Sequence, residues 1–316
     1  MTPELITSAQ NPKLKRLLAL QEKSRLRRSE GVFVVEGRRE LEHCLAAGFE
    51  VESLFICSEI CDAAWLGIPL EGRATRVCTP KNGSFSGTPP EAGGQSRRDG
   101  GVSPKGELPK GEYPNLRQVK VFQLSKEIYS KVAYREGTEG IIAEVKAKYL
   151  TLDDLALKEN PLVMVLEGVE KPGNLGAVLR SADAAGADAV IICDPLTDLY
   201  NPNLIRASIG AVFTVPVVCC SSEDAIAFLK ARGIRILTAQ LQDSSPYYDV
   251  DMTCGTALVM GTEATGLTPV WRIAADVHIL IPMLGRLDSL NVSVSAAILL
   301  YEAVRQRQVV VKKDLF

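Results

Sequence analysis

The sequence predicts an α/β protein made of two α/β units, the second of which is built on a parallel sheet. In the second half of the chain, short runs rich in Val, Ile and Leu alternate with segments of helical periodicity. This is the pattern of buried parallel strands joined by helices. The first 60 residues alternate in the same way over shorter segments. A length of 316 residues is enough for two domains of ordinary size.

The first unit covers residues 1–145 and begins with a basic amphipathic helix. Pro12–Arg28 carries leucines at helical spacing, which gives this helix one apolar side. Residues 80–118 interrupt the unit, and we expect them to form a mobile insertion because a segment so rich in Gly, Pro and Ser cannot bury enough surface to offset its ordering entropy. The other expected elements are strands at Val32–Glu36, Val51–Cys57, Val119–Leu124 and Ile141–Val145, and helices at Arg38–Ala47 and Ser125–Val132.

Residues 146–160 read as a linker, and residues 161–316 form the second unit. Its predicted strands are continuous aliphatic runs, which indicates that both faces of the sheet are covered. These strands are expected at 162–167, 188–193, 213–219, 234–239, 256–260 and 277–281, with helices at 174–186, 202–210, 223–232, 268–274 and 290–308.

Basic residues are concentrated near the start of the chain. The net charge is only −2, so the protein as a whole is not a general binder of polyanions. Between Lys13 and Arg39, however, nine basic residues face three acidic ones, an excess that would neutralise phosphates. The alternative is a solvated helix face. The residues predicted to contact phosphate groups are Lys13, Lys15, Arg16, Arg25, Arg27, Arg28 and Arg38.

Cysteine and histidine usage predicts neither a metal site nor disulfides. The eight cysteines contain no Cys-x-x-Cys pair, and there are only two histidines. We expect Cys193, Cys219, Cys220 and Cys254, which lie in or beside apolar runs, to be small buried residues. The polar N-terminus is unlike a secretory signal, and no apolar run is long enough to span a bilayer. The expected location is therefore the cytoplasm, with no membrane partner.

Three loops that follow predicted strands carry the candidate chemistry, since ligands of open α/β sheets bind at the carboxyl ends of strands. In the first, Asn174 is placed to cap a helix, Gly176 allows a close backbone approach, and Arg180 follows six residues after Asn174. Read alone, this is also an ordinary capped helix with a solvated arginine. It is not the dinucleotide fingerprint, because Gly-x-Gly-x-x-Gly is absent.

The second and third loops are rich in glycine and small polar residues. The second places two glycines around an acidic residue before a helix that starts near Thr268, although it is equally readable as a structural turn. The third runs through Pro282 and Gly285 into a helix that we expect a serine to cap. Polar residues then alternate with small apolar ones near the start of that helix, which is unusual for a helix that only packs.

Taken together, the strings NLGAVLRSADAAGA, VMGTEATGL and IPMLGRLDSLNVSVSAAILLYEA resemble the SpoU (TrmH) family of RNA ribose methyltransferases, within the SPOUT superfamily. The resemblance covers roughly residues 160–305. The segment ITSAQNPKLKRLLALQEKSRLRRSEGVFVVEGRRELEHCLAAG is similar, more diffusely, to the family's L30-like RNA-recognition domain. The insertion at 80–118 departs from the compact form of that domain.

The resemblance implies a knotted C-terminal SPOUT domain preceded by a small L30-like α/β domain. It also implies S-adenosylmethionine as cofactor, no metal, and a homodimer that packs around the knot. The substrate it implies is RNA, with ribosomal RNA favoured over transfer RNA by analogy alone. The positions matching cofactor contacts are Gly261, Ile281 and Leu290, with Leu237 and Thr238 as weaker candidates.

The implied catalytic residues are Arg180, Asn174, Glu263, Ser289 and Asn291. Arg180 matches the arginine proposed as the base in this family. A guanidinium group, however, loses its proton at neutral pH only at a cost of about 7–8 kcal/mol. Holding the target phosphate and stabilising the 2′-oxyanion is an easier role for it. Asn174 is expected to hold the ribose or Arg180, and Glu263 to orient that arginine or its loop. Ser289 and Asn291 are expected to position the 2′-hydroxyl and support the cofactor loop.

Three alternatives stay open. They are a 2′-O-methyltransferase acting on transfer RNA, a base methyltransferase with the same fold, and a non-catalytic RNA-binding relative. The third would be expected to lack Arg180, Asn291 or the glycine loop, all of which are present.

Overall fold

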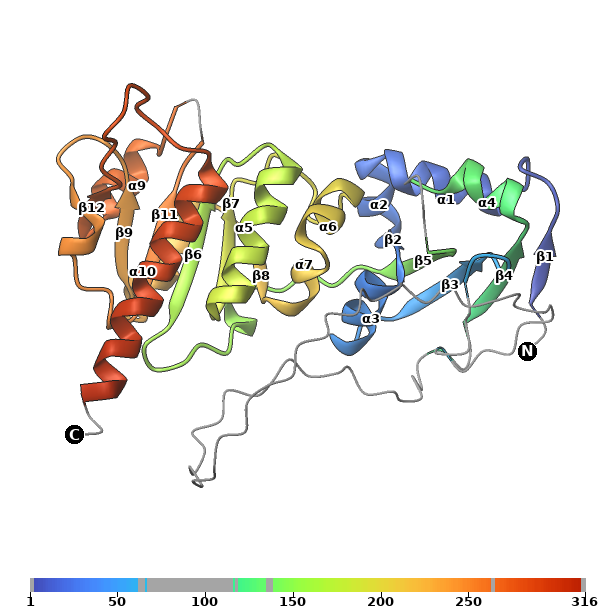
Figure 1. The fold of residues 1–316 in the computed structure, drawn as a ribbon, viewed down its shortest axis with the longest axis horizontal. Coiled ribbons are helices and arrows are strands. Elements are labelled where there is room, and N and C mark those ends of the chain that lie inside the picture. The colour runs from blue at the N-terminus through green and yellow to red at the C-terminus, as the bar shows by residue number, and fades with distance from the viewer. Residues whose placement is uncertain are drawn as a thin grey trace, which may run out of the picture.

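Two sheets lie side by side along the molecule and are joined by short helices between them (Figure 1). The computed structural model describes residues 3–61, 66, 116, 119–134, 139–262 and 265–313. For residues 309–313, at the end of the last helix, it describes the backbone only. The expected insertion at 80–118 therefore lies outside the described residues, apart from Leu116. In the described part of the chain, no helix is both long enough and apolar enough to cross a membrane.

The first sheet is mixed and has the order β1-β4-β3-β5-β2. Strands β1, β4 and β3 are parallel, and β5 runs antiparallel to β3 and β2. Its expected strands are present, and the three-residue β1 is added at one edge. The bounds are β1 (Glu4–Ile6), β2 (Val32–Glu36), β3 (Val51–Ile56), β4 (Lys120–Leu124), β5 (Ile141–Lys146), α3 (Arg38–Ala46) and α4 (Lys126–Val132).

The predicted helix at Pro12–Arg28 is two helices, α1 (Pro12–Glu22) and α2 (Ser24–Glu30). Asn11 caps α1, since its side chain accepts a hydrogen bond from the amide of Lys13. Lys23 has an extended backbone (φ −104°, ψ 103°), which ends the first helix and changes the direction of the second. Leucine spacing alone did not reveal this break.

The second sheet has seven strands, all parallel, in the order β10-β12-β9-β11-β6-β7-β8. The prediction of a parallel α/β sheet is thus confirmed. The strands are β6 (Leu162–Glu167), β7 (Ala189–Cys193), β8 (Val217–Cys220), β9 (Arg235–Ala239), β10 (Ser245–Pro246), β11 (Thr256–Met260) and β12 (Val277–Leu280). The helices are α5 (Pro172–Ala185), α6 (Pro202–Ser208), α7 (Ala211–Thr214), α8 (Ser222–Ala231), α9 (Pro269–Ala274) and α10 (Val292–Lys313), with short 3-10 turns at Leu152–Asp154 and Tyr247–Asp249.

Helices cover both faces of the second sheet, because side chains that alternate along β6 pack into two different apolar clusters. Met164 and Leu166 belong to one apolar cluster together with residues of α5 and α10, whereas Val163 and Val165 belong to another with residues of α8 and α9. In Figure 1, α10 lies alongside α5 on the same side of this sheet. Every β6 residue is buried as a result, which explains why its sequence is apolar from Leu162 to Leu166, before the buried Glu167 at its end.

The expected strand at 213–219 is wrong in its first half, because residues 211–214 form the helix α7. Phe213 leaves the sheet to pack in an aromatic cluster with Phe33 and Phe49 of the first unit. The expectation of buried cysteines also fails in part. Cys193 is buried, Cys220 and Cys254 are half-buried, and Cys219 is exposed at the end of β8.

A continuous apolar core joins the two units. Phe33 stacks on Tyr200 with ring centroids 4.1 Å apart, and the hydroxyl of Tyr200 donates to the carbonyl of Lys148. Beside this cluster, Arg27 Nε donates to Asp198 Oδ2 over 2.6 Å. Segment 198–214 of the second unit thus fixes the first unit against the sheet that carries the candidate site.

Candidate active site

The three candidate loops lie at the same edge of the second sheet, because they follow strands that run in parallel. Residues 168–171 follow β6, residues 261–267 follow β11, and residues 281–291 follow β12. Three hollows lie around these loops. We name them the glutamine, asparagine and arginine hollows after residues that line them.

The glutamine hollow, of about 370 Å³, lies between the segments that follow β9, β11 and β12. Ile281, Leu290 and Ser289, which the sequence analysis assigned to one site, all line this hollow. Leu237 and Thr238 do not line it. Both are 0% exposed, so their side chains do not reach the hollow, and their assignment as cofactor contacts stays a prediction. The strand continues beyond them, and the next two residues, Ala239 and Gln240, reach the hollow instead.

Gln240 was missed by the sequence reading, and its side chain is the most informative polar group of this hollow. Its Nε2 donates to the carbonyl of Gln242 over 2.9 Å. Its Oε1 is buried and accepts no hydrogen bond from any described residue. A buried acceptor without a donor costs free energy, so it indicates a missing partner at this position. Apolar side chains make up much of the remaining wall, including Met260, Leu267 and Met283.

The asparagine hollow, also of about 370 Å³, lies on the other side of the loop after β11. Asn174 and Gly261 line it, together with Lys171. Thr262 and Thr265 line both this hollow and the glutamine hollow, so the two cavities share a wall. The sequence reading did not single out either threonine, since neither falls at a strand end or a cap.

Two asparagines from segments far apart in sequence meet here. Asn291 Nδ2 donates to Asn174 Oδ1 over 3.1 Å. Asn291 also caps α10, because its Oδ1 accepts from the amide of Ser293 over 3.0 Å and from the hydroxyl of the same residue over 2.6 Å. The cap predicted from a serine is therefore an asparagine. Asn174 lies in the first turn of α5, which begins at Pro172, and is not the predicted cap of that helix.

The glycine loop after β11 is held in one tight conformation. A Cβ atom on Gly261 would lie 2.3 Å from the carbonyl carbon and oxygen of Gly266, so only glycine fits there. Thr262 and Gly266 exchange two backbone hydrogen bonds, of 3.2 and 3.1 Å. Glu263, the predicted acidic residue of this loop, lies outside the described residues.

A buried carboxylate anchors the far end of the same loop. Glu167, at the end of β6, is 4% exposed and accepts from the amide and the hydroxyl of Thr268 over 2.8 and 2.6 Å. The hydroxyl of Ser222 lies within hydrogen-bond distance of Glu167 Oε1, and Trp271 Nε1 donates to Ser222 Oγ. Thr268 directly precedes α9, whose first residue is Pro269, as predicted. This network fixes the point at which the glycine loop returns to the sheet.

The arginine hollow, of about 570 Å³, lies beside the crossing of α5 and α6. Arg180 lines it together with Arg206, a residue that the sequence reading missed because it carries no motif. The two helices approach closely at Gly176, where a Cβ atom would lie 2.6 Å from the Cβ of Ala207. The predicted close approach at Gly176 is thus confirmed. Within a single chain, Arg180 lies in a different hollow from the two asparagines.

Ion pairs change the interpretation of the basic segment in the first unit. Arg27 is 3% exposed and donates to the carbonyls of Leu20 and Gln21 as well as to Asp198, so it does not face solvent. The prediction that Arg27 contacts RNA is therefore wrong, since its charge is used inside the protein. Its place in the sequence, one residue from Arg28, gave no sign of this.

The remaining basic residues differ in how far their charge is already neutralised. Arg16 pairs with Glu30 and Glu144, Lys13 with Glu4, and Arg38 with Glu42. Burial raises the pKa of the Glu144 carboxyl, against the opposing effects of a hydrogen bond from Ser53 and the charge of Arg16. The exposed members without a partner among the described residues are Lys15, Arg25 and Arg28.

Among the described residues, no three His, Cys, Asp or Glu side chains gather into a group that could hold a metal ion. The three hollows are lined by amide, hydroxyl and charged side chains, among them Glu170, Lys171 and Asp288, beside apolar walls. Such a site can position a polar substrate and an apolar ligand beside each other.

Comparison with known proteins identifies similar sequences over both units. Residues 161–301 match the model of the SpoU rRNA Methylase family, and residues 11–78 match that of the MRM3-like substrate binding domain. The chain is 38% identical over 195 residues to the 23S rRNA (guanosine-2′-O-)-methyltransferase RlmB of Vibrio vulnificus, covering 60% of this chain and 79% of that protein.

Solved structures are similar over nearly the whole chain. The crystal structure of an RNA 2′-O ribose methyltransferase is 32% identical with a TM-score of 0.71, covering 96% of this chain and 99% of that one. An AdoMet-bound rRNA methyltransferase from Sinorhizobium meliloti has a TM-score of 0.75 at 24% identity, covering 96% of this chain and 97% of that one, and this similarity concerns the fold.

Proposed function

This chain belongs to the SpoU rRNA methylase family, and we propose that it transfers methyl groups from S-adenosylmethionine to ribose 2′-oxygens of 23S ribosomal RNA. The observation that carries the proposal is the shared wall of the glutamine and asparagine hollows. One hollow suits a cofactor that has an adenine ring and amino groups, and the other is lined by Asn174, which Asn291 holds by a hydrogen bond. A methyl group has only a short distance to move between two adjacent cavities.

The glutamine hollow fits S-adenosylmethionine by its chemistry. Its apolar wall suits an adenosine group, and the unpartnered Oε1 of Gln240 would accept from an amino group of the cofactor. We assign cofactor contacts to Ile281 and Leu290, and backbone contacts to the loop that begins at Gly261. Ser289 lines this hollow, so we assign it to the cofactor loop. When bound, S-adenosylmethionine supplies an electrophilic methyl group on a sulfonium centre.

The asparagine hollow would hold the target ribose. Asn291 is fixed by its role as the cap of α10, and it fixes Asn174 through their shared hydrogen bond. This pair would orient the 2′-hydroxyl towards the wall formed by Thr262 and Thr265. A hydroxyl group is a poor nucleophile, so the emerging negative charge on its oxygen needs stabilisation. The positive charge of Arg180 would stabilise that negative charge from the phosphate side, and the role of Glu263 in orienting the arginine or its loop stays a prediction.

We also propose the finer features that the family resemblance implies. Segment 281–291 would pass through the glycine loop to form the knot, because α10 packs beside α5 although it follows β12. A homodimer would cover α10, where Val294 is 47% and Tyr301 50% exposed. Residues 1–145 would recognise RNA through Lys15, Arg25 and Arg28, joined by the linker 146–160 to the catalytic unit of residues 161–316. The enzyme would act in the cytoplasm, on the ribosomal RNA of its cell.

The test is methyl transfer from labelled S-adenosylmethionine to unmodified 23S rRNA, with unmodified transfer RNA as the competing substrate. We expect label in 23S rRNA with the wild-type protein, and a loss of at least about tenfold in turnover for Asn291→Ala. Binding of S-adenosylmethionine, measured by calorimetry, should distinguish the two hollows. Asn291→Ala should keep cofactor affinity, whereas Gln240→Leu should lower it. Label in transfer RNA alone would contradict the substrate assignment.

A further inference from the structure

The arginine hollow brings together two positive charges that no residue in the described part of the chain neutralises. Arg180 extends from α5 and Arg206 from α6, and both side chains are exposed in the same cavity of about 570 Å³. Over the described ranges, neither guanidinium group has a hydrogen bond or an ion pair. By contrast, the exposed guanidinium group of Arg38 is paired with Glu42. Two adjacent cations without an anion favour the binding of one.

The helix crossing fixes the spacing of the two arginines. Ala207 follows Arg206 directly, and its backbone carbon would lie 2.9 Å from a Cβ atom on Gly176. Arg180 lies one turn after Gly176 on α5, so both guanidinium groups extend from the same rigid contact between helices. A cavity preorganised in this way loses little entropy when it binds a ligand.

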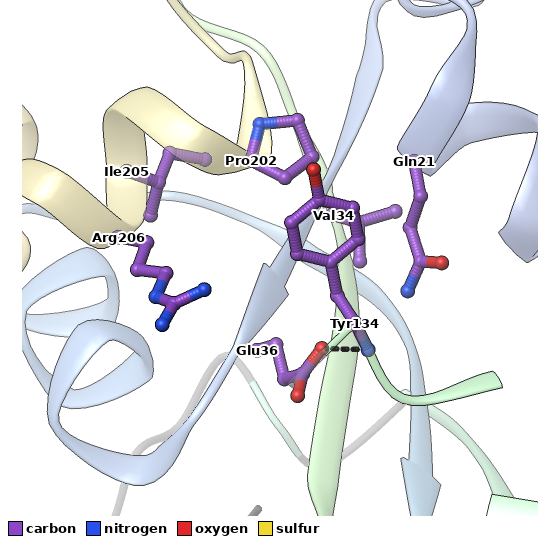
Figure 2. Close-up of a pocket in the computed structure, with 7 residues that line it drawn as sticks. All are labelled: Gln21, Val34, Glu36, Tyr134, Pro202, Ile205 and Arg206. Carbon is purple, nitrogen blue, oxygen red and sulfur yellow. Dashed lines mark hydrogen bonds between the residues drawn. The ribbon is translucent and has the colours of Figure 1, made fainter. Parts of the chain in front are cut away.

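A third donor comes from Asn203, which also lines the arginine hollow. Its Oδ1 accepts from the hydroxyl of Tyr134, in the first unit, over 3.1 Å. That contact leaves the NH₂ group of Asn203 as its remaining donor side. Tyr134 is itself held by Glu36, which accepts from its amide over 2.7 Å (Figure 2). The first unit therefore sets the orientation of a polar group in the catalytic unit.

Arg206 is the residue that connects the two regions. It lines the arginine hollow together with Arg180, and it also lines the pocket between the units shown in Figure 2, with Tyr134 and Glu36. Arg206 therefore faces two cavities, one between the two units and one beside Arg180. Guanidinium groups bind phosphate oxygens with two parallel hydrogen bonds, which a point charge cannot do.

We infer that Arg180 and Arg206 together bind one phosphodiester group of the RNA strand next to the target ribose, with Asn203 as an additional donor. This inference rests on the proposed function, since it assigns the backbone contact of the same substrate. Arg206 is then an RNA-binding residue that holds the strand where it crosses from the first unit to the catalytic unit. The ligand class is an RNA phosphodiester, recognised without regard to base.

The experiment measures binding of an unmodified 23S rRNA transcript across a series of NaCl concentrations. Arg206→Ala should raise the Kd about tenfold and reduce the slope of log Kd against log salt by about 0.7–0.9, the value for one lost phosphate contact. Arg206→Lys should restore the slope and only part of the affinity. The matched control is Arg232→Ala, which removes an exposed arginine stacked on Phe228, on the opposite face of the second sheet.

A double substitution tests whether both arginines hold the same phosphate. When Arg180→Ala is already present, Arg206→Ala should weaken binding by less than about threefold, because the shared contact is already lost. Cofactor affinity should stay within about twofold of wild type in every variant, which excludes a general loss of structure. A Kd and salt slope for Arg206→Ala equal to those of Arg232→Ala would overturn the inference.

The outcome is separable from that of the proposed function. If the wild-type protein transfers no methyl group but loses salt-dependent RNA binding on Arg206→Ala, the methyltransferase proposal fails and the phosphate contact stands. If methyl transfer occurs and Arg206→Ala changes neither binding nor turnover, the phosphate contact fails and the methyltransferase proposal stands.

Discussion

Gly173 and Gly176 lie in the same helix, α5, and differ in the space around them. A Cβ atom on Gly173 would meet nothing within 4 Å, whereas one on Gly176 would lie 2.6 Å from Ala207 Cβ and 2.8 Å from the amide nitrogen of Ser208. Alanine is favoured over glycine inside a helix by about 0.5–1 kcal/mol, and both positions would share part of this gain. Only Gly176→Ala forces the backbones of α5 and α6 apart, which should lower the free energy of unfolding by about 1–3 kcal/mol.

The comparison of the two variants isolates the cost of the helix crossing. We expect Gly173→Ala to unfold at the same or a higher urea concentration than wild type, and Gly176→Ala at a lower one. The two free energies of unfolding should differ by about 1–3 kcal/mol, since the helix propensity largely cancels. Gly176→Ala should also reduce turnover, because moving α6 by several tenths of an ångström displaces Arg206 from Arg180. Equal unfolding midpoints for the two variants would refute the close crossing.

Three further predictions follow from buried charge and from the glycine loop. Arg27→Ala leaves Asp198 buried without its partner, so it should cost about 3–5 kcal/mol in urea unfolding; a loss below 1 kcal/mol would contradict the buried pair. Gly261→Ala should weaken cofactor binding by at least about tenfold in calorimetry, whereas Gly285→Ala, which meets nothing within 4 Å, should leave it unchanged. The raised pKa of Glu144 means that wild type loses stability relative to Glu144→Gln as the pH rises from 4.5 through the raised value. Urea midpoints at pH 4.5 and 7 should therefore diverge in favour of Glu144→Gln, and the opposite trend would be inconsistent with a raised pKa.

The strand and helix order of the second unit was predictable because burial on both faces leaves a strong signal in the sequence. Every residue of β6 is buried, and the corresponding run in the sequence is apolar from Leu162 to Leu166. An apolar run can be a buried strand or a buried helix, and the strand prediction failed where the run begins as a helix. The apolar run that includes Phe213 was read as one strand, although its first half is a helix packed on the first unit.

The candidate site was predictable where a residue type has a strong local meaning. Gly176 and Gly261 both lie at close backbone approaches, as glycines in such positions often do. The sequence could not reveal that Arg27 is buried against Asp198, because the two lie 171 positions apart and in different units. It also could not reveal that the side chain of Thr238 is buried between strands, where its hydroxyl forms a hydrogen bond with His278 Nδ1.

Residues without a motif were found only through the fold. Gln240 lies two residues beyond the predicted cofactor contact Thr238, and its unpartnered oxygen is visible only once the surrounding strands are in place. Arg206 is one of many arginines in the chain, and it becomes a candidate because the crossing at Gly176 places it beside Arg180. Spacing along the chain cannot report either neighbourhood.

The central claim is that this chain methylates a ribose 2′-oxygen. Its most direct test is nucleoside mass spectrometry of 23S rRNA after incubation with the protein and isotopically labelled S-adenosylmethionine, with Arg180→Ala in parallel. The account predicts a labelled 2′-O-methylnucleoside with wild type and at least about a hundredfold less of it with Arg180→Ala. A label found on a base, or a yield that does not depend on Arg180, would contradict it.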